Sequence, residues 1–234
     1  MRLNLFVFYI VIFILNAAHN VIASEITAYE LIYNEQEPGT DIYRVRFVIS
    51  DKYIRIDNDV NEEGEGGYII YDDHKRKIHS VSNFDKTILV IPHYEHKQPE
   101  IEKQVEINYS ALTDAPTISG KTVYSYTVHA ESEKCMDIQL VPGLLPGISK
   151  ILKAYQGVVA GQQVKVLKTT PEEYQTTCFL YDQVYNDGTY YEKGLPIQEW
   201  HSNGKLRVLD SYKEIKVDST LYDLPDGYRE YSLD

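Results

Sequence analysis

The chain has 234 residues, which is long enough to bury one sizeable hydrophobic core. Its formal net charge of −12 disfavours nucleic acid or an anionic membrane surface as the main partner, and the spread of the acidic residues along the chain indicates a solvated surface. Tyrosine is unusually frequent, with 21 residues; it is typical of strands with one wet face, and a tyrosine-lined ligand groove is the alternative.

The N-terminus predicts a cleavable signal peptide over residues 1–23. Arg2 precedes an apolar run, Leu5 to Leu15, that is too short to span a bilayer comfortably, and Ala23 is the small residue before the cleavage point. A retained signal anchor is the alternative. No later segment is apolar enough to cross a membrane. We therefore expect an exported, periplasmic protein without a stable membrane span, in which residues 24–234 form a single domain.

Short alternating runs predict β-strands through most of the remaining chain. The run 43–49 places Val45, Phe47 and Ile49 on one face, and the run 52–57 places Ile54 and Ile56 in the same way. Similar runs occupy residues 68–72, 77–81, 86–91, 105–109 and 122–128, and three more follow in the last third. Two of these last runs flank an Asn-Gly pair at residues 203–204, which is the strongest short-range signal for a hairpin.

One segment, residues 144–161, has helical spacing instead. Its apolar stripe consists of Ile148, Ile151, Leu152, Tyr155, Val158 and Val159. Pro146 suits the first turn and Gly161 suits the end, while Gly157 in the interior favours a close approach of another backbone. Together the patterns predict a mainly β (α+β) fold. We expect a curved antiparallel sheet that forms a half-open β-barrel, with this amphipathic helix covering the concave face.

The two cysteines, Cys135 and Cys178, predict one disulfide. They are the only cysteines in the sequence, and in an exported chain such a pair is most simply bridged. The bridge would tie the strand before the helix to the strand after it. Neither cysteine belongs to a CxxC motif, so a catalytic redox role is disfavoured.

Signals for metal binding or catalysis are weak. The pair His93 and His96, with Glu95 and Glu100, lies in a polar loop that has no helix to fix ligand geometry, and the acidic turn 62–65 lacks the spaced ligands of a calcium loop. No GxSxG, Walker or GxGxxG pattern marks a catalytic or phosphate-binding loop. We therefore expect no metal, no cofactor and no catalytic residue, and so a non-enzymatic protein.

The order of the predicted elements resembles the outer-membrane lipoprotein-carrier superfamily, which comprises the LolA-like and LolB-like periplasmic proteins. The resemblance covers most of residues 25–230 and rests on the strands YRVRF and KYIRID, on the strand pair 67–72 and 77–81, and on the ending LYDLPDGY at residues 221–228, which is similar to FxLPxGY in that family. It implies a half-open barrel with an apolar cleft for acyl chains or another hydrophobe. The cysteine pair and the long connection 161–177 depart from the family pattern, which favours a distinct subfamily.

The predicted ligand site is the set of inward-facing apolar residues on these strands and the helix: Val45, Phe47, Ile49, Ile54, Ile56, Ile148, Ile151, Leu152 and Tyr155. Because no arginine shares these faces, we expect a neutral lipid or another hydrophobic small molecule, not an anion. The predicted function is thus an exported carrier or sensor of such a ligand. The alternative is a cell-envelope interaction or scaffold protein, in which a packed-shut barrel docks an envelope protein through a strand edge or a tyrosine-rich face. A hydrolase with an unrecognised site is a third possibility.

Overall fold

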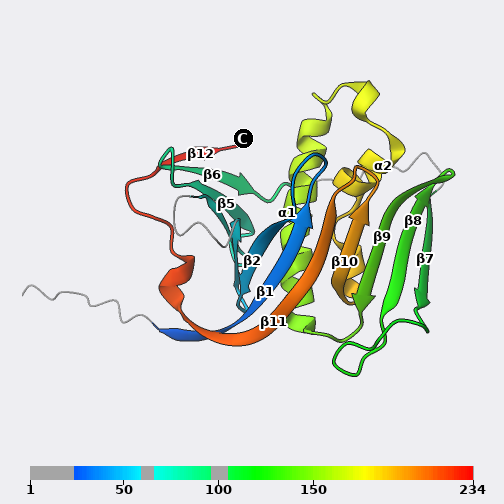
Figure 1. Cartoon of the computed structure of the whole chain (residues 1–234). Helices are drawn as coiled ribbons and strands as arrows, with labels where there is room; N and C mark the ends of the chain where they lie inside the picture. The colour runs from blue at the N-terminus through cyan, green and yellow to red at the C-terminus, as the bar shows by residue number, and fades with distance from the viewer. Residues whose placement is uncertain (1–23, 59–65, 96–104, 234) are drawn as a thin grey trace, which may run out of the picture.

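A computed structural model describes residues 24–58, 66–95 and 105–233 of the chain. The predicted signal peptide, the acidic turn 62–65, and His96 and Glu100 lie outside these ranges. Within them the protein is mainly β, with 12 strands in one mixed sheet and two α-helices (Figure 1). No helix in the described ranges is both long and apolar enough to cross a membrane.

The strands follow one another across the sheet nearly in chain order. The order is β12-β6-β5-β4-β3-β2-β1-β11-β10-β9-β8-β7, and the sheet is curved but not closed into a barrel (Figure 1). The strand bounds are β1 Glu25–Gln36, β2 Tyr43–Ile49, β3 Tyr53–Asn58, β4 Tyr68–Asp72, β5 Lys77–Ser82, β6 Thr87–Pro92, β7 Val105–Ala111, β8 Tyr124–Ala130, β9 Glu133–Val141, β10 Leu195–His201, β11 Leu206–Asp218 and β12 Arg229–Ser232.

All neighbouring strands are antiparallel except β12 and β6, which are parallel. The prediction of a wholly antiparallel sheet is therefore wrong for this pair. Its physical reason is the position of β11 beside β1 in the middle of the sheet, from which the chain must cross several strands to reach the edge at β6. A crossover of this kind can place a strand parallel to its neighbour, which a tight hairpin cannot do.

Helix α1 spans Pro146–Leu167 and so continues beyond the predicted end at Gly161. Pro146 lies in the first turn, as predicted. Gly161 is buried within the helix, which continues because the residues that follow include good helix formers such as glutamine and lysine. The expected close backbone approach at Gly157 is wrong, since a Cβ atom built there meets open space.

Between α1 and β10 the chain forms short helical turns. They are η1 Glu172–Tyr174, α2 Thr177–Leu180, the π-turn η2 Tyr181–Tyr185 and η3 Thr189–Glu192. The predicted disulfide between Cys135 and Cys178 is confirmed. However, it ties β9 to α2 and not to a strand after the helix, because Cys178 lies in α2.

The sheet buries side chains on both of its faces. On β2, Phe47 and Ile49 join the main core together with α1, whereas Val48 points to the other face and joins a second cluster with Tyr222. This split follows from the alternation of side chains along a strand. Tyr222 stacks on Tyr53 at 5.3 Å between ring centroids and donates a hydrogen bond to the Val48 carbonyl at 3.4 Å. The turn η4 (Ser219–Tyr222), which opens the closing LYDLPDGY segment, thus covers the face opposite the main core.

Candidate functional site

The residues predicted to line a hydrophobic cleft all lie in or against the main core. Eight of the nine are at most 5% exposed: the three from β2, the two from β3, and Ile148, Ile151 and Leu152 from α1. Tyr155 is half-buried, packs against the same cluster, and meets Tyr71 edge-on at 5.7 Å between ring centroids. The structure therefore brings the predicted set together, and it does so as side chains packed on one another.

A cavity of about 710 Å³ lies against the opposite face of α1. The helix contributes six residues, which are offset from the buried stripe by about half a turn at 3.6 residues per turn. They are Pro146, Ser149, Lys150, Lys153, Ala154 and Gly157. None of the predicted cleft residues lines this cavity. Helix α1 thus lies between the packed core and the cavity.

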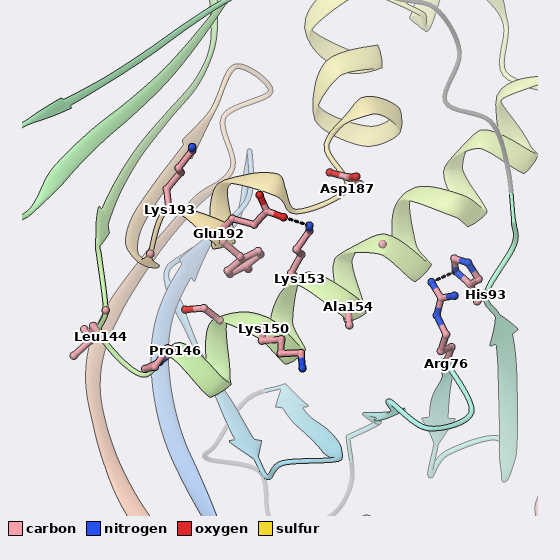
Figure 2. A pocket seen from close by; sticks show the side chains of 15 residues that line it. Arg76, His93, Leu144, Pro146, Lys150, Lys153, Ala154, Asp187, Glu192 and Lys193 are labelled. Carbon is pink, nitrogen blue, oxygen red and sulfur yellow. Dashed lines mark hydrogen bonds and ion pairs between the residues drawn. The ribbon is translucent and has the colours of Figure 1, made fainter.

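The other walls of the cavity come from distant parts of the chain (Figure 2). The segment 187–194, which includes η3, faces α1, and an ion pair between Lys153 and Glu192 links the two walls. Arg76, in the turn after β4, and His93, just after β6, close a further side and share a hydrogen bond of 3.2 Å.

The charges around the cavity are mainly positive, in contrast with the chain as a whole. Its charged lining comprises Arg76, Lys150, Lys153 and Lys193 against Asp187 and Glu192. The hydrogen bond from Lys153 lowers the pKa of Glu192, so this acid stays ionised as the partner of that lysine. Asp187 accepts a hydrogen bond of 2.6 Å from the Thr189 hydroxyl. Both acids are therefore engaged within the protein.

A second polar cluster is buried between the sheet and η2. His201 Nδ1 lies 2.7 Å from Asp182, and its Nε2 lies 3.8 Å from Glu199. Arg207 pairs with Glu35 at 2.7 Å and with Glu199 at 3.6 Å. Both imidazole nitrogens thus face carboxylates, which leaves neither nitrogen directed at a substrate as a general base requires.

The pKa values of this cluster follow from its pairing. Burial acts to lower the pKa of His201, but hydrogen bonds and charge from Asp182 and Glu199 outweigh it and raise the pKa to about 9. Burial acts to raise the pKa of Glu199, but Arg207 and His201 outweigh it and lower the pKa to about 2. The cluster is an ionised, mutually paired network that holds η2 against the sheet.

A metal site is not formed by the residues that the structure describes. Across residues 24–58, 66–95 and 105–233, no three histidine, cysteine, aspartate or glutamate side chains are grouped so as to hold a metal ion. His93 of the predicted pair contacts Arg76 beside the cavity.

The fold and the site define a β-rich protein with an open, curved sheet, one long helix and a ligand-sized cavity beside that helix. No protein-family model and no curated protein matches the chain.

Among solved structures, the chain is similar to PNGF-II in two crystal forms. Both have a TM-score of 0.42, with 10% identity in the C2 form and 9% in the P21 form. The matches cover 89% and 88% of this chain but 31% of the PNGF-II chain, so this chain spans less than a third of it. An uncharacterized conserved protein from Thermus thermophilus has a TM-score of 0.42 at 5% identity, with 88% of this chain and 90% of that chain covered. Similarity at this level carries no argument about function.

Proposed function

We propose that the protein is an exported, non-enzymatic binding protein that carries or senses a small ligand with an apolar part. The observation that carries this proposal is the cavity of about 710 Å³ beside α1. Its size falls within the range of about 300–1,000 Å³ that is common for ligand pockets. Leu144, Pro146, Ala154 and Tyr191 supply apolar surface in its wall. The Cys135–Cys178 disulfide supports export, since disulfides persist in oxidising compartments such as the periplasm.

The proposal includes the architecture expected from the sequence, a half-open barrel whose concave face is covered by α1. Contacts of α1 with β3, β5, β6 and β10, and its share in the main core, support this arrangement. The filled core moves the proposed ligand from the predicted cleft to the outer side of the helix. Membership of the lipoprotein-carrier superfamily stays a prediction, as does a lipid ligand.

A packed-shut interaction module is the second candidate function. It is favoured by the burial of the predicted cleft residues, which fill the space between α1 and the sheet. The strand β7 would then dock an envelope protein, because it lies at the edge of the sheet and exposes Ile107 by 49% and Tyr109 by 40%.

Cavity filling separates the two candidates. In Gly157→Leu the new side chain enters the cavity, and the helix gains a better helix former. Gln163→Leu places the same residue on the same helix away from the cavity lining and is the matched control. If the proposal holds, the neutral dye Nile red binds the wild type and the control but not Gly157→Leu. Equal binding by all three proteins, or no binding at all, would support the interaction module.

A further inference from the structure

We propose that the ligand of this cavity is an organic oxyanion, a carboxylate or phosphate group on an apolar chain, with its anionic group held at the N-terminal end of α1. The inference rests on the proposed binding function and adds the chemistry of the ligand. Three features of the described residues support it, and each is independent of the others.

The first feature is the start of α1, whose positive partial charge is not offset by an acidic side chain. Leu145 at the N-cap provides no side-chain hydrogen bond, and the first turn has no acidic residue. Pro146 has no N–H, and the N–H groups of Ile148 and Ser149 donate to the Leu145 carbonyl at 2.9 Å and 3.1 Å. The N–H of Gly147 and the helix dipole supply the positive partial charge at this end. An anion is the natural partner of such an end in a helix of 22 residues.

The second feature is the hydroxyl group of Ser149, in the first turns of α1. The residue is 5% exposed, and its Oγ atom is buried without a hydrogen-bond partner among the described residues. Ser149 nevertheless lines the cavity. A buried hydroxyl without a partner is unfavourable, so this one points to a ligand atom that accepts a hydrogen bond from it.

The third feature is positive charge that the protein does not neutralise. Lys150 is exposed beside Ser149 and has no hydrogen-bond or ion-pair partner within the described ranges. Lys193 and Arg76 add charge on two other walls. The two acidic residues of the lining offset two of its four basic side chains, Glu192 by pairing with Lys153, so the cavity keeps a formal excess of two positive charges.

These local charges reverse the expectation of a neutral ligand, which followed from the formal net charge of −12 and from strand faces without arginine. At physiological ionic strength, exposed charges farther away than about 8 Å are largely screened. The groups that line the cavity therefore decide its preference. Leu144, Ala154 and Tyr191 remain available to an apolar chain.

Calorimetric titration of the purified full chain tests the inference with decanoate, decyl phosphate and decanol, which share one alkyl chain. We expect at least one of the two anions to bind about tenfold more tightly than decanol, as a charge-assisted contact implies. Lys150→Gln and Ser149→Ala should each weaken the better anion severalfold and leave decanol unchanged. Lys168→Gln, with the same charge change at the other end of α1, is the matched control and should alter neither affinity.

The outcomes distinguish this inference from the proposed function. If decanol binds as tightly as both anions, or if the lysine and serine variants bind all three probes like the wild type, the oxyanion inference is overturned while the binding function stands. If no probe binds, both are overturned. Tighter binding of decanoate than of decyl phosphate assigns a carboxylate, and the reverse order assigns a phosphate.

Discussion

The buried His201 makes a sharp prediction about how stability depends on pH. Its imidazole lies between Asp182 and Glu199, and its side chain is 11% exposed. The folded state raises its pKa from 6.5 to about 9. A raised histidine pKa contributes stability that is fully present below about pH 6.5 and is lost as the pH rises through about 9.

The size of the effect follows from that shift. A change of one pKa unit corresponds to about 1.4 kcal/mol, so the span from 6.5 to about 9 corresponds to about 3 kcal/mol of unfolding free energy. The site is almost fully shielded from solvent, which limits screening by salt. The wild type should therefore lose up to about 3 kcal/mol of stability between pH 6 and pH 9.5 through this group.

Urea unfolding followed by circular dichroism at several pH values measures this loss. His201→Gln removes the titrating group and should flatten the pH dependence while lowering stability at pH 6. His74→Gln is the control: His74 lies exposed in the turn after β4, and its replacement should leave the wild-type slope in place. An equal slope in the wild type and in His201→Gln would refute the assignment of a charged, doubly paired imidazole.

Three further outcomes are expected. Labelling of the denatured, non-reduced protein should find no free thiol, and replacing both Cys135 and Cys178 by serine should lower stability by up to about 4 kcal/mol; two reactive thiols would contradict the bridge. Leu152→Ala should lower the unfolding free energy by about 2–5 kcal/mol in thermal or urea unfolding, because this side chain is 3% exposed in the core; a near-neutral effect would contradict its packing. Gly157→Ala should raise stability by about 1 kcal/mol, because alanine is the better helix former. Gly194→Ala should lower it by about 1–3 kcal/mol, because the new Cβ would lie 2.6 Å from the Val141 carbonyl. Equal melting temperatures of the two variants would contradict this contrast.

Features that depend on neighbours in the sequence were predicted well. The Asn-Gly pair forms the hairpin between β10 and β11, where Gly204 has a φ of 87° and Asn203 accepts a hydrogen bond from the Lys205 N–H. The start of α1 at Pro146 and the pairing of the cysteines likewise followed from local chemistry and from counting. These signals need no knowledge of the tertiary fold.

The strands that were missed have patterns set by tertiary structure. β1 lies between β2 and β11 at the centre of the sheet, and its residues Leu31, Ile32 and Tyr33 are all buried, so simple alternation is lost. β12 consists of four residues, all of them exposed, and its parallel partner β6 is far away in the chain. β11 was predicted as two runs because polar residues interrupt it. A β-bulge shifts the register of its pairing with β1 near Asp210, and the strand continues beyond the bulge.

The cavity could not be predicted from the sequence, because it too depends on tertiary structure. Its walls come from the turn after β4, the end of β6, the start of α1 and the segment 187–194, and no spacing in the sequence relates these segments. The alternation of apolar and polar residues on α1 correctly identified the face that packs into the core. It could not show whether the polar face meets solvent or a cavity, because Ser149 and Lys150 suit either environment. That distinction depends on η3 returning to face α1, and the ion pair between Lys153 and Glu192 marks where the two segments meet.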